Sequence, residues 1–229
     1  MIKLIRNYFS KGELLLWSAS SLLVIISFLL FDRKNYLILS ASLIGVTYLI
    51  LNSKGNPSGQ VLVIVFSLMY GVISYNFSYF GEMITYLGMT TPMAVLALIS
   101  WLKNPYNGNR AEVKIGGIGK TEAACMMIMA AIVTVLFYFV LKAFNTANII
   151  PSTLSVTTSF IAVYLTFRRD PFYAVAYAAN DVILIILWTM ASMSDSRYIS
   201  VVVCFVVFFV NDIYSFFRWQ ELKKQQIEA

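Results

Sequence analysis

Eight long apolar runs constrain this sequence more than any other feature. Each run holds about twenty mainly apolar residues, the length that a helix needs to cross the hydrocarbon core of a membrane. Only 12% of the 229 residues are charged, whereas a soluble domain carries about a quarter. The sequence therefore predicts an all-α integral membrane protein with about eight transmembrane helices, which cover roughly residues 13–31, 36–52, 60–78, 81–102, 121–145, 151–167, 171–192 and 197–218.

The positive charges are distributed unevenly between the connecting loops. If the N-terminus lies in the cytoplasm and the chain crosses eight times, 13 Lys and Arg residues fall inside and 4 fall outside. Positive residues favour cytoplasmic loops, so we expect a multi-pass protein of the plasma (inner) membrane with both termini cytoplasmic. The outer residues are Arg33, Lys34, Lys142 and Arg197, and the inner ones are Lys3, Arg6, Lys11, Lys54, Lys103, Arg110, Lys114, Lys120, Arg168, Arg169, Arg218, Lys223 and Lys224.

Metal, cofactor and nucleotide chemistry find little support in the sequence. The chain has no His, and Cys125 and Cys204 lie far apart inside apolar runs. The glycine-rich stretch 116–121 ends like a phosphate-binding loop, but Lys114 stands where that motif needs its first Gly. The net charge of +6 is explained by Lys and Arg residues in the loops on one side of the membrane, so it does not indicate a nucleic-acid-binding surface. We expect no metal, no cofactor and no nucleic-acid partner.

Runs two to four and runs six to eight repeat one architecture. Sliding the first block by 118 positions lays Trp101 on Trp219 and Tyr70 on Trp188. Four crossings separate equivalent helices, so the two blocks share one orientation. The pattern predicts two parallel three-helix bundles joined by a linker helix (3+1+3), plus an extra N-terminal helix. The expected divisions are 1–32 (N-terminus and extra helix), 33–102 (first bundle), 103–145 (cytoplasmic loop and linker helix), 146–219 (second bundle) and 220–229 (cytoplasmic tail).

Two Asn-Asp pairs lie deep inside apolar runs. Asn180 and Asp181 stand in the seventh run, and Asn211 and Asp212 stand in the eighth. Ionisable residues in a membrane helix are costly and mark a functional site by default. At about 1.5 Å per residue, both pairs lie roughly 10–14 Å from the inner surface. They predict a shared polar layer, in which one member of each pair faces a solute and the other braces a neighbouring helix. Helix packing by hydrogen bonds is the alternative, and it is our expectation for the hydroxyl residues at 152–159.

Aromatic residues accompany the two acidic residues. Tyr177 and Trp188 lie on the same side of the seventh helix as Asp181, and Tyr214 lies near Asp212. A carboxylate beside aromatic rings suits a flat cationic ring, and amide and carboxylate oxygens suit sugar hydroxyls. Trp188 has an alternative interpretation as an anchor at the membrane interface.

The first bundle offers further candidates. Gln60 opens the third helix at its inner end, and Tyr70 lies ten residues further on. Pro92 stands within the fourth helix and should kink it. Trp101 and Trp219 end their helices at the inner surface, where we expect them to anchor the protein in the interface.

Four short motifs follow one another within residues 36–226. They are Gly59-Gln60 with Tyr70, the stretch from Pro92 to Trp101-Leu102-Lys103-Asn104, the stretch from Tyr177-Ala178-Ala179-Asn180-Asp181 to Leu187-Trp188, and Phe208-Phe209-Val210-Asn211-Asp212-Ile213-Tyr214-Ser215-Phe216 followed by Trp219. In this order and spacing they resemble the PnuC nicotinamide riboside transporters.

The resemblance implies a fold similar to that of the SWEET sugar transporters, but with its own connectivity of the helices. It implies facilitated diffusion of nicotinamide riboside without ion or ATP coupling, followed by trapping through a cytoplasmic kinase. The binding residues that it implies are Asn180, Asp181, Trp188, Asn211 and Asp212. Relatives on this scaffold carry thiamine, riboflavin or other nucleosides, which stay open as alternative substrates.

Two other classes of function are alternatives to transport. Asp181 and Asp212 at one depth would permit intramembrane aspartyl chemistry, but the flanking Asn and aromatic residues fit binding better, so we do not expect an enzyme. A non-transporting membrane scaffold or sensor is the other alternative. The expected partners are a small-molecule substrate and the lipid bilayer, and the sequence leaves the oligomeric state open, a homo-oligomer included.

Overall fold

The structure, a computed structural model, describes residues 8–76, 79–146 and 148–228. Within these ranges eight helices are long and apolar enough to cross a membrane, which confirms the all-α fold and the eight predicted runs. Lys3 and Arg6 of the orientation count, and the end of predicted run 60–78, lie outside the described residues. The spans are α2 (Lys11–Phe31), α3 (Tyr36–Ser53), α4 (Ser58–Asn76), the composite of α5 (Phe80–Ile84), a π-helix (Thr85–Thr90) and α6 (Thr91–Lys103), then α7 (Lys120–Ala143), α8 (Ile149–Arg168), α9 (Tyr173–Ser192) and α10 (Ile199–Glu228).

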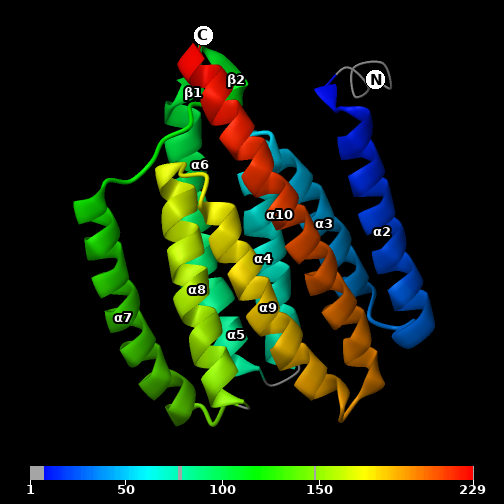
Figure 1. The fold of residues 1–229 in the computed structure, drawn as a ribbon. Coiled ribbons are helices and arrows are strands. Elements are labelled where there is room, and N and C mark those ends of the chain that lie inside the picture. The colour runs from blue at the N-terminus through cyan, green and yellow to red at the C-terminus, as the bar shows by residue number, and fades with distance from the viewer. Residues whose placement is uncertain (1–7, 77–78, 147, 229) are drawn as a thin grey trace.

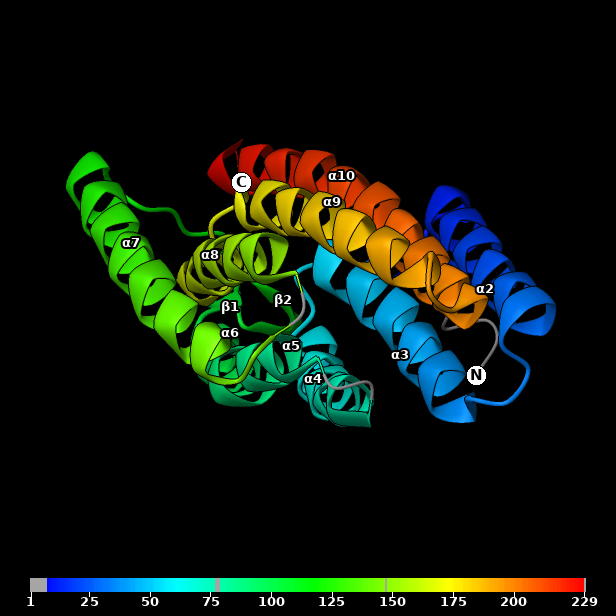
Figure 2. The same cartoon turned by 90° about the horizontal axis from the view of Figure 1, so that it is seen from below.

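Six of these helices form a closed ring. In the first half of the ring α3 packs on α4 and α4 on α6, and in the second half α8 packs on α9 and α9 on α10. The ring closes where α6 meets α8 and where α10 meets α3 (Figures 1 and 2). These halves are the two predicted three-helix bundles.

The other two spans lie outside the ring. Helix α7 packs mainly on α8 and joins the two bundles, while α2 packs on α3 and α10 at the other edge of the molecule (Figure 1). The start of α2 and the end of α10 lie at the same end of the protein, as an even number of crossings requires. We call this end the termini face and the other end the opposite face.

Polar contacts fasten α2 to the ring at the termini face. Glu13 is buried and forms an ion pair with Lys54 at 3.3 Å, and the Tyr214 hydroxyl donates to the same carboxylate at 3.3 Å. Deeper in the membrane region, about one turn before Tyr214 on α10, the side-chain amide of Asn211 donates to Ser20 Oγ at 3.0 Å. These contacts give the extra helix one defined position.

The fourth span changes its winding ahead of Pro92. A π-helix, Thr85–Thr90, precedes this residue, which stands in the first turn of α6, and the kink expected at Pro92 stays a prediction. Thr91 Oγ1 donates to the carbonyl of Tyr86 at 2.8 Å, five residues earlier. Proline has no N–H to donate to the preceding turn, and the wider winding accommodates that missing bond. Single π turns of this kind occur frequently at functional sites.

A small hairpin and a long last helix extend the termini face. Strands β1 (Pro105–Tyr106) and β2 (Asn109–Val113) pair in the loop between α6 and α7, which the sequence did not predict. Helix α10 continues to Glu228, so most of the expected tail 220–229 is helical. The Gln226 side chain accepts from the Ile115 N–H at 2.7 Å and thereby ties the end of α10 to this loop.

The loop 104–119, which we call the strap, also joins the two bundles. The Val113 N–H donates to the carbonyl of Gly55 in the first bundle at 2.9 Å, and the Gly116 N–H donates to the carbonyl of Arg169 in the second at 2.9 Å. The Ile118 N–H donates to Asp170 Oδ2 at 3.0 Å. Backbone donors of the glycine-rich stretch thus serve protein acceptors in this structure.

Candidate functional site

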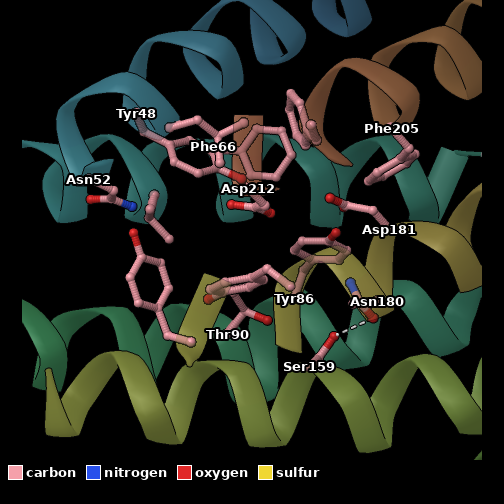
Figure 3. A pocket seen from close by; sticks show the side chains of 15 residues that line it. Tyr48, Asn52, Phe66, Tyr86, Thr90, Ser159, Asn180, Asp181, Phe205 and Asp212 are labelled. Atoms are coloured by element: carbon pink, nitrogen blue, oxygen red, sulfur yellow. Dashed lines mark hydrogen bonds between the residues drawn. The ribbon is translucent and has the colours of Figure 1, made fainter. Parts of the chain in front are cut away.

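A cavity lies inside the ring, and its wall is formed by α3, α4, α8, α9, α10 and the π-helix of the fourth span (Figure 3). Its open volume is about 30 Å³, which holds roughly one or two water molecules. A larger solute therefore enters only when side chains or helices move apart. The lining residues are Tyr48, Leu49, Asn52, Val63, Phe66, Tyr86, Thr90, Ser159, Tyr173, Tyr177, Asn180, Asp181, Phe205, Phe208 and Asp212.

The charge of the wall comes from Asp181 and Asp212. Both side chains point into the cavity from α9 and α10 (Figure 3) and are 4% and 2% exposed. Their carboxyl groups lie close enough to share a hydrogen bond with each other, and one buried oxygen of each has no other partner among the described residues. None of the residues in this wall is a Lys or Arg. Buried carboxylates without a basic partner carry a large desolvation cost, which a cationic solute would offset.

Asn180 supplies an oriented amide beside the acidic pair. Thr158 Oγ1 and Ser159 Oγ of α8 both donate to Asn180 Oδ1, at 2.9 and 3.1 Å. With its oxygen held by α8, the amide nitrogen turns toward the cavity (Figure 3). The hydroxyls at 158 and 159 were expected to pack helices, and here they orient a site residue as well.

Aromatic rings fill most of the remaining wall. Phe66 is at the centre of this group, with ring centroids 5.3 Å from Tyr48, 5.6 Å from Phe208 and 6.0 Å from Tyr86. Planar rings beside carboxylates attract a flat cation both through charge and through the ring quadrupoles. The same rings account for the small volume of the cavity, because they occupy the space that a ring-shaped solute would take.

The helical repeat explains where the structure places Asn211 and Tyr214. Asp212 lines the cavity, but Asn211 donates to Ser20 and to the carbonyl of Val207, and Tyr214 bonds to Glu13. Neighbours on a helix are about 100° apart, so both residues face α2 instead of the cavity. For this pair one member faces the cavity and the other braces a helix, whereas Asn180 and Asp181 both line the wall.

Gln60, Tyr70 and Trp188 do not line the cavity either. The Gln60 amide donates to Asn52 Oδ1 at 3.1 Å, so it lies behind a wall residue. Tyr70 and Trp188 contact each other at 6.2 Å and form a layer toward the opposite face, where Tyr70 also packs on Tyr86 at 4.5 Å. This layer closes the cavity on that side.

All three of the tryptophans discussed above as anchors are buried. Trp101, Trp188 and Trp219 are each 0% exposed, so the prediction of interfacial anchoring was wrong for Trp101 and Trp219. Trp219 packs on Trp101 and on Tyr173, a wall residue, at centroid distances of 5.4 and 4.8 Å. These rings close the cavity on the side of the termini face.

Several wall residues were missed in the sequence. Tyr48 and Asn52 are two of them, four apart on α3 and therefore on one helix face, and Tyr173 is a third, four residues before Tyr177, which was a candidate and does line the cavity. That spacing was a usable signal. Phe66 had none, because a Phe in an apolar helix looks the same whether it faces lipid or a cavity.

Comparison with known proteins gives consistent results. The family model described as nicotinamide mononucleotide transporter matches residues 35–221. The nicotinamide riboside transporter PnuC of Neisseria mucosa is 21% identical over 199 residues, which cover 85% of this chain and 76% of that protein. The nicotinamide riboside transporter PnuC of Haemophilus influenzae is 20% identical over 192 residues, covering 83% and 82%. A crystal structure of the vitamin B3 transporter PnuC matches with a TM-score of 0.83 at 19% identity and covers 95% of this chain and 94% of that one.

Proposed function

The chain belongs to the nicotinamide mononucleotide transporter family, and from this premise we propose that it carries nicotinamide riboside across the membrane by facilitated diffusion. This agrees with the resemblance found in the sequence. The observation that carries the proposal is the acidic, aromatic cavity around Asp181 and Asp212, in whose wall no Lys or Arg occurs among the described residues.

The charge of the cavity favours the riboside over the mononucleotide. Nicotinamide riboside has a cationic pyridinium ring and a neutral ribose, whereas the mononucleotide adds a phosphate dianion. Two buried carboxylates without Lys or Arg would repel that phosphate, since like charges in a medium of low dielectric constant interact strongly. We assign the pyridinium ring to Asp181, Asp212 and the surrounding rings, and the ribose or carboxamide to Asn180.

We also propose that the termini face is cytoplasmic, on the basis of the 13 to 4 distribution of Lys and Arg. Passive transport then delivers the riboside to a cytoplasmic kinase. Phosphorylation creates the anion that the acidic cavity disfavours, so the product does not return along the same route. This mechanism needs no ion gradient and no ATP hydrolysis by the transporter.

Thiamine is the second candidate, because it is also an aromatic cation that the same wall would accept. Riboflavin is neutral and should bind less well. Competition for binding among nicotinamide riboside, thiamine, riboflavin and the mononucleotide would rank these ligands. We expect the riboside to bind most tightly and the mononucleotide most weakly.

Uptake into proteoliposomes tests the transport step. We expect labelled nicotinamide riboside to reach equal concentrations on both sides without any ion gradient. Uptake that requires a proton or sodium gradient would contradict passive transport, and tighter binding of the mononucleotide would contradict the assigned role of the carboxylates. Empty liposomes and the Asp212→Asn variant serve as controls.

A further inference from the structure

Glu82 is a buried carboxylate that the central site does not use. Its side chain is 2% exposed, and Ser155 Oγ of α8 donates to its Oε1 at 2.9 Å. No ion pair between described residues includes Glu82. A carboxylate inside a membrane span with one hydroxyl partner and no basic partner is costly, and helix packing alone does not require a charge at this position.

Glu82 lies between the opposite face and the cavity. It is in α5, four residues before Tyr86, so one turn of the fourth span separates Glu82 from the cavity wall. The hydroxyl groups of Tyr70, Tyr79 and Tyr86 all lie within electrostatic reach of its carboxylate.

An aromatic layer separates Glu82 from the central acids. Tyr70 packs on Tyr86 at 4.5 Å, and Tyr79 packs on Trp188 at 4.9 Å. The Tyr70 hydroxyl and the Trp188 indole N–H are buried beside each other, and neither makes a hydrogen bond of regular geometry within the described residues. Buried donors without a well-formed bond are uncommon and call for an explanation, and a ribose that passes between them would supply hydroxyls to both. A solute that moves from the opposite face toward the cavity therefore meets Glu82 first, then the aromatic layer, and then Asp181 and Asp212.

We propose that Glu82 is an outer binding station for the cationic solute, which holds the pyridinium ring before the aromatic layer opens toward Asp181 and Asp212. The inference rests on the function proposed above and extends its site by one residue. A cation leaving water for an aromatic layer loses hydration, and a carboxylate at the entrance offsets part of that loss. Charge at the entrance of a path raises the rate of entry more than the final affinity.

The winding of the fourth span supports movement at this point. The π-helix begins three residues after Glu82, and Pro92 follows it. Such a break in regular winding lets α5 change its angle while α6 keeps its place in the ring. In that movement Glu82 would become accessible from the opposite face together with Tyr86.

Three variants distinguish a charge role from a hydrogen-bond role. Glu82→Gln keeps the shape and an acceptor for Ser155 but removes the charge, Glu82→Asp keeps the charge, and Ser155→Ala removes the hydroxyl. Initial uptake of nicotinamide riboside at low concentration is measured in proteoliposomes, and equilibrium affinity is measured in detergent. We expect Glu82→Gln to lose at least about tenfold in uptake, the scale of one lost charged contact, with affinity within about twofold of the parent protein. Glu82→Asp and Ser155→Ala should keep most of the uptake.

Uptake by Glu82→Gln at the parental rate would overturn the proposal, and so would an equal loss in Ser155→Ala, which would indicate helix packing. Should Glu82→Gln not fold, Glu82→Met replaces it, because an apolar side chain needs no buried partner, and the same loss is expected. Absence of riboside uptake by the parent protein would instead refute the proposed function, so the two failures are distinct.

Discussion

Trp101 and Trp219 lock the two bundles together at the termini face, because each donates a hydrogen bond from its own bundle to the other. Their ring centroids lie 5.4 Å apart. The Trp101 indole N–H donates to the carbonyl of Thr166 in the second bundle at 2.9 Å, and the Trp219 indole N–H donates to the carbonyl of Asn52 in the first at 2.7 Å. Each bundle thus holds the first helix of the other.

The same pseudo-symmetry appears in the layer at the other end of the cavity. Trp101 and Trp219 are 118 positions apart, and so are Tyr70 and Trp188. Tyr70 and Trp188 also contact each other, with centroids 6.2 Å apart. Residues at equivalent positions of the two bundles therefore contact each other at the pseudo-twofold axis. One such pair lies on each side of Asp181 and Asp212. Alternating access requires that these two layers open in turn.

Trp219→Phe tests the lock on the termini side. The variant keeps a ring but loses the bond to Asn52, which is worth about 1 kcal/mol, so the population open to this side should rise about fivefold. In a background with Cys125→Ser, a hydrophilic reagent should label Thr90→Cys in the cavity wall about fivefold faster.

Trp17→Phe is the matched control, because the Trp17 indole N–H also donates a hydrogen bond, to Thr47 Oγ1 at 3.2 Å, but lies on α2 outside the ring. It should leave the labelling rate unchanged. An unchanged rate in Trp219→Phe would show that the indole bond does not hold the cavity closed.

The fold could be predicted from the sequence to a large extent because its causes are local. Runs of apolar residues report helices and membrane depth directly. The division into two bundles could be predicted because Trp101 aligns with Trp219 and because an even number of crossings separates equivalent helices. The hairpin of β1 and β2 and the helical end of α10 were missed because both depend on contacts with residues far away in the chain, such as Gln226 with Val113 at 3.1 Å.

The site could be predicted only in part, for a reason of geometry. Sequence shows that Asn211 and Asp212 are deep in the membrane, but the rotation of α10 about its axis decides which of them faces the cavity. That rotation is set by packing against α9 and α3. Trp101 illustrates the same limit, because hydropathy does not distinguish an interfacial tryptophan from one buried between helices.

Asp212→Asn should lower the affinity for nicotinamide riboside at least about tenfold, since a contact with a charged group is worth about 1.5–3 kcal/mol. The unfolding free energy of the ligand-free protein should stay equal or rise, because a buried charge without a basic partner is removed. Calorimetric titration and thermal unfolding in detergent measure the two quantities.

Asp195→Asn provides the comparison for this change. Asp195 is bound to Arg197 at the opposite face, so its replacement should leave riboside affinity as it was. Equal affinity in Asp212→Asn and the parent protein would exclude a direct contact between Asp212 and the cation.

Gly45→Ala should reduce transport through a single wall residue. An added Cβ at Gly45 would overlap Cζ of the Phe208 ring, so the ring must move away from α3. We expect riboside affinity to fall severalfold while the helix itself is not weakened, because Ala favours helix over Gly by about 1 kcal/mol. Gly12→Ala is the control in a binding titration, because its added Cβ would meet only Ser10 Oγ, at 3.9 Å. Parental affinity in Gly45→Ala would mean that Phe208 can shift without affecting the site.

Lys54→Met should destabilise the docking of α2 by leaving Glu13 buried without its partner at 3.3 Å. The cost should be at most about 3 kcal/mol, below the range for fully buried pairs, because Lys54 is 13% exposed. The double variant Glu13→Gln with Lys54→Met should recover most of the loss in thermal unfolding. If the double variant is no more stable than Lys54→Met, the loss does not come from the unpaired carboxylate.

Gly116→Ala should release the strap from the second bundle, because an added Cβ would lie 2.5 Å from the backbone oxygen of Arg168. That oxygen belongs to the end of α8, where Arg169 has a φ of 59° and the backbone has little freedom to shift. The bond from the Gly116 N–H to the Arg169 carbonyl should break, at a cost of about 1–3 kcal/mol in unfolding free energy. Trypsin should then cleave the strap at Lys114 faster than in the parent protein.

Gly119→Ala is a close control from the same loop, since nothing lies within 4 Å of its added Cβ, and it should change neither measurement. Equal behaviour of the two variants would show that the strap is not held at Gly116, and the link between the bundles on this face would then rest on Trp101 and Trp219.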